Sequence, residues 1–151
     1  MAYPNDKYQN NRSNFRSGYN QNQPRREESK PAGPFPKEYV DFAEKLMSSN
    51  YRNITTSKLR NILSLLMDAY NTESLRTADT IMEENAVKLQ MARIRLAYEC
   101  GRDFKTKQFV ESANLLPWLK EIGTSREKLL RYVHYVEALV AYHRFFGGRE
   151  N

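Results

Sequence analysis

The sequence is poor in the residues on which metal sites and many enzymes depend. Its 151 residues include one cysteine and two histidines, too few for the four nitrogen and sulfur ligands of a closed zinc site. One cysteine also excludes an internal disulfide. The six glycines are scattered and form no phosphate-binding loop. We therefore expect no metal, no cofactor and no small-molecule substrate.

Long apolar runs are missing as well. No stretch approaches the roughly 18 to 20 consecutive apolar residues that a membrane-spanning helix needs, and the mean hydropathy is −0.80. The N-terminus has no apolar segment behind a charged start, so no secretory signal is expected. These features predict a soluble protein of the cytoplasm.

The first 36 residues differ from the rest of the chain. They contain no Ile, Leu or Val but six Asn and five Pro, so they cannot bury enough aliphatic surface to offset the entropy of ordering. We predict a disordered leader over residues 1–36. Because arginines alternate there with aromatic residues, an accessory RNA-binding arm and a plain solubilising extension both remain open.

Residues 37–151 predict a single all-helical domain. Only four Gly and one Pro occur there, and apolar residues recur at intervals of three and four. We expect a compact bundle of about five helices, at 37–49, 55–70, 80–100, 107–116 and 124–146. The single proline of this region, Pro117, is expected to stop or kink the fourth helix.

The expected third helix has a long apolar stripe. We predict that it buries Val87, Met91, Ile94 and Tyr98, and that Leu89 and Leu96 widen the apolar surface.

Carboxylates do not gather in a catalytic pattern. Glu83 and Glu84 are adjacent, so on a helix they diverge by about 100° and cannot chelate one ion together. Glu99 lies three residues before Arg102, a spacing that predicts an intrahelical ion pair. We expect no metal site and no catalytic residues.

The histidines and the cysteine also give no indication of a catalytic site. His134 and His143 are nine residues apart on one helix and therefore face opposite sides. Cys100 is best interpreted as a small buried residue. One enzymatic alternative stays open, a small hydrolase that pairs His143 with Glu99 or Asp103.

Cations form a pattern of their own. Lys88, Arg95 and Arg102 recur at seven-residue intervals and so form one stripe along the third helix. Such a stripe could follow a sugar-phosphate backbone. It could equally be a solvated face, because Glu84 and Glu99 stand close enough to neutralise part of the charge. The composition leaves both interpretations open.

The last helix carries aromatic residues on more than one side. Tyr135 and Tyr142 lie on a side distinct from Tyr132. Either this helix is buried on several sides, or Tyr135 and Tyr142 form a protein interface, where tyrosine is common.

Three segments carry a family resemblance. TTSKLRNIL at 55–63, YECGRD at 98–103 and YVEALVAYHR at 135–144 resemble, in order and spacing, the small subunit of the type III-A CRISPR effector, the Csm complex. The resemblance covers about residues 53–148.

This resemblance implies a non-catalytic bundle of about five helices that acts in the prokaryotic cytoplasm. Several copies would stack beside the subunits that hold the guide RNA and would line the groove of the target RNA. The implied partners are other Csm subunits, further copies of the chain, target RNA and the guide–target duplex.

Cations within or beside the resembling segments are the predicted RNA-facing residues. They are Lys58, Arg60, Arg93, Arg95, Arg102, Lys105 and Lys107. The alternative function is that of a helical adaptor that binds only proteins, with Tyr135 and Tyr142 as its anchor.

Overall fold

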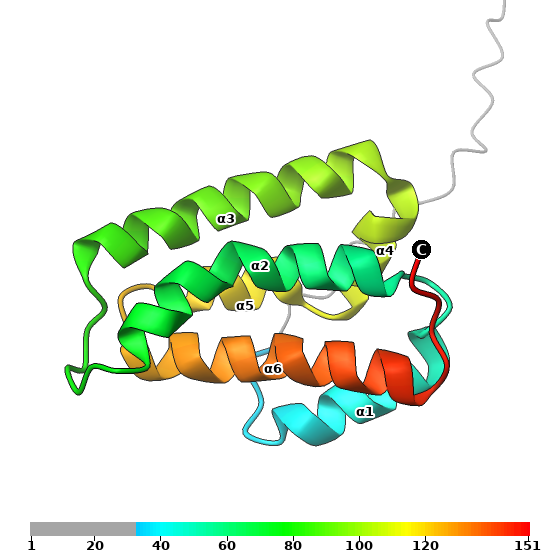
Figure 1. Cartoon of the computed structure of the whole chain (residues 1–151), viewed down its shortest axis with the longest axis horizontal. Coiled ribbons are helices and arrows are strands. Elements are labelled where there is room, and N and C mark those ends of the chain that lie inside the picture. The colour runs from blue at the N-terminus through cyan, green and yellow to red at the C-terminus, as the bar shows by residue number, and fades with distance from the viewer. Residues whose placement is uncertain (1–32) are drawn as a thin grey trace, which may run out of the picture. The chain divides into compact units, whose positions relative to one another are not determined.

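The computed structural model describes residues 33–151, which form a bundle of α-helices (Figure 1). The helices are α1 (Tyr39–Asn50), α2 (Thr56–Glu73), α3 (Glu83–Arg102), α4 (Phe104–Ser112), α5 (Leu115–Glu121) and α6 (Arg126–Phe145). The prediction of an all-helical fold is confirmed. The predicted leader lies, for residues 1–32, outside the described residues.

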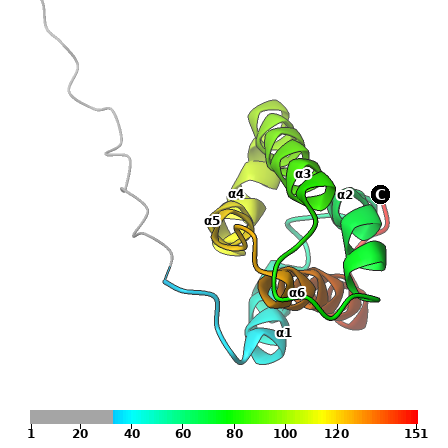
Figure 2. The same ribbon diagram turned by 90° about the vertical axis from the view of Figure 1, so that its left-hand side faces the viewer.

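Helix α6 is the central element of the bundle. It packs against α1, α2 and α5, while α3 packs against α2, α4 and α5. Two perpendicular views place α1 and α3 on opposite sides of the bundle (Figures 1 and 2). The α6 hydroxyls of Tyr132 and Tyr135 donate to the carbonyl oxygens of Leu115 and Ala113, at 2.8 and 2.9 Å. These bonds tie α6 to the junction between α4 and α5.

That junction explains why the described residues form six helices rather than about five. Helix α4 ends at Ser112, and Asn114 takes a left-handed conformation with φ 53°. The chain therefore breaks before Pro117, which lies in the first turn of α5. Proline is tolerated there because the first amides of a helix have no intrahelical acceptor. The prediction that Pro117 ends or kinks the fourth helix is wrong, because that helix already ends at Ser112.

Helix α3 leaves exposed the stripe that was predicted to be buried. Val87, Met91, Ile94 and Tyr98 are 57%, 53%, 61% and 64% exposed. The buried residues are Asn85, Leu89, Ala92, Leu96 and Cys100. The predicted burial of the stripe from Val87 to Tyr98 is wrong because α3 has two apolar stripes, whereas Leu89, Leu96 and Cys100 lie inside as predicted. The stripe with small residues allows neighbouring helices to approach closely.

Residues just before the predicted boundary at residue 37 contact the helices of the bundle. The ring of Phe35 packs edge-on against Trp118 and Tyr135, with centroids 5.3 and 5.8 Å apart. The Trp118 indole donates to the Gly33 carbonyl oxygen at 2.9 Å. Aromatic packing, which needs no aliphatic residue, thus places this segment against α5 and α6.

The end of the chain caps the beginning of α2. The amides of Thr56 and Ser57 donate to the carbonyl oxygens of Arg149 and Glu150, at 2.9 and 3.0 Å. The Thr55 hydroxyl accepts from the Lys58 amide at 3.3 Å, as the threonine-rich start of this helix predicts. Three orphan amides of α2 are thereby satisfied.

A buried carboxylate holds the connection between α2 and α3. Glu73 is fully buried and accepts from the Asn85 side chain, the Met82 amide and Arg76, each at 2.7 Å. Burial alone raises its pKa, but the three hydrogen bonds and the charge of Arg76 outweigh that effect and lower it. Glu73 is therefore ionised in the fold at neutral pH, and it helps to fix where α3 starts.

We predict that Gly148→Ala lowers the free energy of unfolding by about 1–3 kcal/mol. A Cβ at this buried glycine would overlap the imidazole of His143, which cannot move aside because both ring nitrogens are within hydrogen-bonding distance of Ile54 and Thr56. Urea denaturation measures the effect. The control is Gly101→Ala, where a Cβ meets no atom within 4 Å. Equal stability of the two variants would contradict the prediction.

We predict that Glu73→Gln lowers the free energy of unfolding at pH 7 by about 1–3 kcal/mol. Because the folded pKa is lowered, the stabilisation is present above the ordinary value of 4.5 and is lost as the pH falls through the lowered pKa. The difference between variant and wild type should therefore shrink in acid, as thermal unfolding between pH 3 and 7 would show. Glu127→Gln removes only an exposed pair with Arg131 and should cost about 0.5 kcal/mol or less.

Candidate nucleic-acid interface

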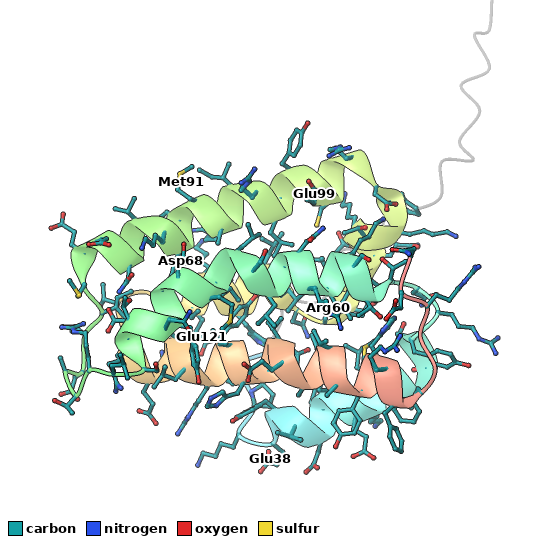
Figure 3. All side chains as sticks on the ribbon, viewed as in Figure 1. Glu38, Arg60, Asp68, Met91, Glu99 and Glu121 are labelled. Atoms are coloured by element: carbon teal, nitrogen blue, oxygen red, sulfur yellow. The ribbon has the colours of Figure 1, made fainter. Side chains whose placement is uncertain are left out.

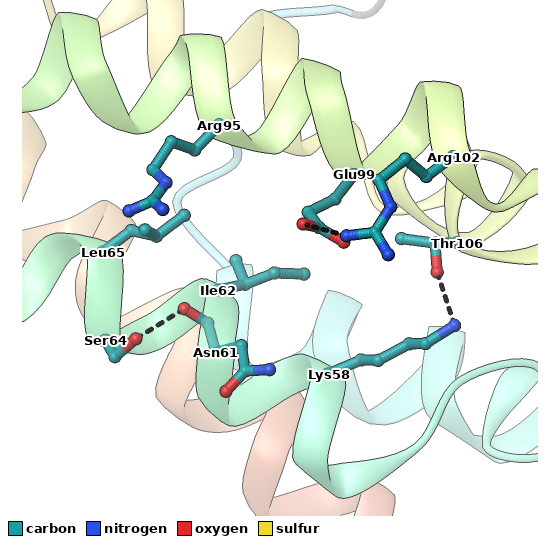
Figure 4. A pocket seen from close by; sticks show the side chains of 9 residues that line it. All are labelled: Lys58, Asn61, Ile62, Ser64, Leu65, Arg95, Glu99, Arg102 and Thr106. Carbon is teal, nitrogen blue, oxygen red and sulfur yellow. Dashed lines mark hydrogen bonds and ion pairs between the residues drawn. The ribbon is translucent and has the colours of Figure 1, made fainter.

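A groove between α2 and α3 gathers cations from both helices. Its volume is about 380 Å³, and Figure 4 shows the side chains that line it. They are Lys58, Asn61, Ile62, Ser64, Leu65, Arg95, Glu99, Arg102 and Thr106. Spacings of three and four residues place Lys58, Asn61 and Leu65 on one face of α2, and likewise Arg95, Glu99 and Arg102 on one face of α3. We call this site the α2–α3 groove.

Lys58 is held at one end of the groove. Its ammonium group forms an ion pair with Asp103 and donates to the Thr106 hydroxyl at 3.1 Å. Asp103 also accepts from the Lys105 amide and the Thr106 hydroxyl, both at 3.0 Å, and so caps the start of α4. The lysine position is therefore set by the turn between α3 and α4.

The two arginines of the groove differ in their partners. Arg102 pairs with Glu99 at 3.4 Å, which confirms the predicted intrahelical ion pair, and its guanidinium lies 5.6 Å from the Tyr98 ring centre. Arg95 extends into the groove (Figure 4). Within residues 33–151, no carboxylate lies within ion-pair distance of Arg95. Its charge is thus available to a ligand.

The other four predicted RNA-facing cations lie elsewhere. Arg60 is exposed on the part of α2 that faces away from α3 (Figure 3). Arg93 lines a different groove, between α3 and α5. Lys105 is exposed at the start of α4, and Lys107 lines a small groove beside Cys100. The structure therefore brings together only Lys58, Arg95 and Arg102.

Sequence reasoning missed the neutral polar residues of the groove. Asn61, Ser64 and Thr106 line it beside the cations. A signal was present, because Asn61 and Ser64 follow Lys58 at intervals of three along α2.

Tyr135 is not an interface residue. It is fully buried, and its hydroxyl already donates to Ala113; burial also raises its pKa, so it stays protonated. The expectation that it is a protein-binding anchor is wrong because three aromatic neighbours cover it. Tyr142 is half-buried, with its ring 6.2 Å from Phe145 and 6.3 Å from Phe146.

The pair of residues expected of a small hydrolase does not form. His143 is fully buried, where Nε2 donates to the Ile54 carbonyl oxygen at 2.7 Å and Nδ1 lies 3.1 Å from the Thr56 hydroxyl. Neither Glu99 nor Asp103 contacts it. Cys100 is buried, and burial raises the pKa of its thiol, which disfavours the reactive thiolate.

Among residues 33–151, no three histidine, cysteine or acidic side chains lie together as metal ligands would. No helix there combines the length and apolar character needed to cross a membrane.

The comparisons with known proteins agree on one family. A family model described as Csm2 Type III-A matches residues 35–149. The CRISPR system Cms protein Csm2 of Streptococcus thermophilus is 37% identical over 119 residues, 74% of this chain and 93% of that protein. Proteins of the same name from Mycobacterium tuberculosis and Enterococcus italicus are 34% and 31% identical over 117 and 124 residues. These alignments cover 75% and 71% of this chain, and 94% and 88% of the two relatives.

We predict that Asp103→Ala lowers the free energy of unfolding by about 1–2 kcal/mol, because it removes the α4 cap. Asp103→Asn keeps an oxygen for the cap but loses the ion pair with half-exposed Lys58, and it should cost less than half as much. Chemical denaturation of both variants tests this. An equal loss in the two variants would show that the ion pair, and not the cap, stabilises the turn.

Proposed function

Because the chain belongs to the Csm2 family of type III-A CRISPR systems, we propose that its α2–α3 groove binds the backbone of the target RNA. The main observation in support of this proposal is that Lys58, Arg95 and Arg102, from two helices, line one groove. The Asn61 amide adds a donor of a kind that contacts phosphate and sugar oxygens, whereas the hydroxyls of Ser64 and Thr106 already donate to Asn61 and Asp103.

The groove suits backbone contact better than base recognition. In an RNA-guided effector, pairing between guide and target reads the sequence, so a protein subunit needs only to recognise shape and charge. Three cationic side chains along a groove supply positive charge but not the pattern of donors and acceptors that would recognise a particular base. The proposed contact is therefore independent of base sequence.

Several copies stacked along the guide–target duplex would each add one such contact. A single groove with one unpaired arginine binds weakly, but linked contacts raise the effective concentration of the next one. The proposed partners are other Csm subunits, copies of the same chain, target RNA and the guide–target duplex, in the cytoplasm of a prokaryote.

The chain is proposed to be non-catalytic in this assembly. Two observations support this role: His143 is fully buried with no acidic partner, and burial together with the charges of Glu111 and Glu99 raises the pKa of Cys100 and disfavours its thiolate. Target cleavage would then belong to other subunits.

We predict that Arg95→Gln weakens binding of target RNA by the reconstituted effector, whatever the target sequence. Loss of one phosphate contact per copy should lower the slope of log affinity against log salt by about 0.7 for each copy. Binding titrations between 50 and 300 mM salt measure both quantities. Unchanged affinity and slope would rule out the α2–α3 groove as the RNA site.

The matched control is Arg93→Gln. It removes the same charge from the same helix, but Arg93 lies two residues away and lines the groove towards α5. Native mass spectrometry ensures that the effectors compared contain equal numbers of the small subunit. An equal loss for the two variants would indicate general attraction to RNA rather than a site.

A further inference from the structure

The outward side of α3 is an apolar surface with no partner in the bundle. Val87, Met91, Ile94 and Tyr98 are spaced by four, three and four residues, so they share one face, and each is more than half exposed. Figure 3 shows Met91 on the side of α3 that points away from the other helices. We call these four residues the α3 outer stripe. It spans about 17 Å, or three helical turns.

The stripe continues into a hollow between α3 and α5. This second groove has a volume of about 640 Å³ and includes Ile94, which belongs to the stripe as well. Ala97, Leu116 and Pro117 form the rest of its apolar lining. We call it the α3–α5 groove. A ridge beside a groove is the shape against which a second helix packs.

The concentration of exposed apolar residues here is not random. Nine large apolar side chains of the described residues are exposed, and four of them make up the stripe. Met82 precedes α3 directly and Phe104 follows it, and both are exposed too. Scattered single residues need no explanation, but a contiguous strip of this kind marks a binding surface.

Cations border this surface on both sides. Lys88, Arg95 and Arg102 follow the edge nearer α2, and Lys88 and Arg102 hold Glu84 and Glu99. Arg93 and Lys120 border the α3–α5 groove, and no acidic residue of the described chain pairs with either. The excess of positive charge calls for a partner with acidic residues beside its apolar ones.

A second copy of α3 does not meet that requirement. In an antiparallel pair of outer stripes, with Val87 opposite Tyr98 and Met91 opposite Ile94, Arg93 would face Ala92 of the other copy and gain no acidic partner. RNA fits poorly as well, because aliphatic side chains in the middle of the stripe offer no donors to phosphates.

We propose that the α3 outer stripe and the α3–α5 groove bind an amphipathic helix with acidic flanks that belongs to another protein subunit of the effector. The inference rests on the proposed function only in placing the chain within that assembly. The partner helix carries apolar residues at i, i+3 or i+4 and i+7, and its acidic residues face Arg93 and Lys120. The contact forms within the assembly, where neighbouring contacts support it.

Photo-crosslinking in the reconstituted effector identifies the occupant directly. A benzophenone amino acid replaces Ile94, and mass spectrometry locates the crosslinked peptide. The expected product joins position 94 to an acidic helix of a different protein subunit. A crosslink to another copy of this chain, a crosslink to RNA, or no crosslink at all would each overturn the proposal.

Substitution provides the energetic test. Ile94→Gln combined with Lys120→Glu should reduce incorporation of the small subunit into the effector roughly tenfold, since an apolar contact and a charge pair are both lost. Phe145→Gln is the control, because Phe145 is 74% exposed on α6, away from this surface. Circular dichroism confirms that all variants are folded. Incorporation equal to that of the control would overturn the proposal.

Two different measurements distinguish the proposed RNA site from the proposed protein-binding surface. The Ile94 and Lys120 variant should lower the number of incorporated copies while each remaining copy keeps its contribution to RNA affinity. If the proposed function is correct, Arg95→Gln should leave the number of incorporated copies unchanged and lower the contribution of each copy to RNA affinity. A loss of RNA affinity per incorporated copy in the Ile94 and Lys120 variant would assign this surface to RNA and refute the protein partner.

Discussion

The burial of α6 on several sides is the constraint on which the rest of the structure depends. Because α1, α2 and α5 all pack against it, its side chains must satisfy neighbours in different directions. Tyr132 and Tyr135 do so with their rings in the core and their hydroxyls on carbonyl oxygens at the break between α4 and α5. This arrangement places α5, and with it the inner side of α3. An aromatic helix therefore serves as a scaffold rather than as a docking face.

Helix α3 divides the surface of the bundle into regions of different chemistry. Its α2 side carries Arg95 and Arg102 beside polar groups, whereas its outer side carries Met91 and Ile94. The side towards α5 combines an apolar lining with Arg93. One helix thus separates a site suited to a phosphate backbone from a site suited to a protein helix. In the assembly proposed above, this division would let one small chain contact both RNA and a protein subunit.

The positions of these sites are secured by polar contacts at both ends of α3. At the start, Glu73 bonds to Met82 and Asn85. At the end, Asp103 binds Lys58 across the groove and caps α4. Each carboxylate joins α2 to the segment that precedes or follows α3. The width of the α2–α3 groove is therefore set by contacts that are distant in sequence and that no local pattern reveals.

Much of the architecture could be predicted from local patterns, since helix formation follows from the spacing of apolar residues and from capping by residues such as Thr55. The pairing of Glu99 with Arg102 is also local, three residues apart on one helix. The number of helices was harder to predict from the sequence. The break at Asn114 depends on a residue in the left-handed conformation and on tyrosine hydroxyls that donate to the carbonyl oxygens of Ala113 and Leu115.

By itself the sequence determined the all-helical class, the approximate helices, the shortage of catalytic groups and the resemblance to a CRISPR small subunit. The tertiary structure decided which side of α3 is buried, and it showed that Tyr135 is internal and that only three of seven predicted cations share a groove. The physical reason is that periodicity defines the faces of a helix but not their neighbours. Where two apolar stripes compete, close packing of small residues such as Ala92 selects the inner one, and the other remains exposed.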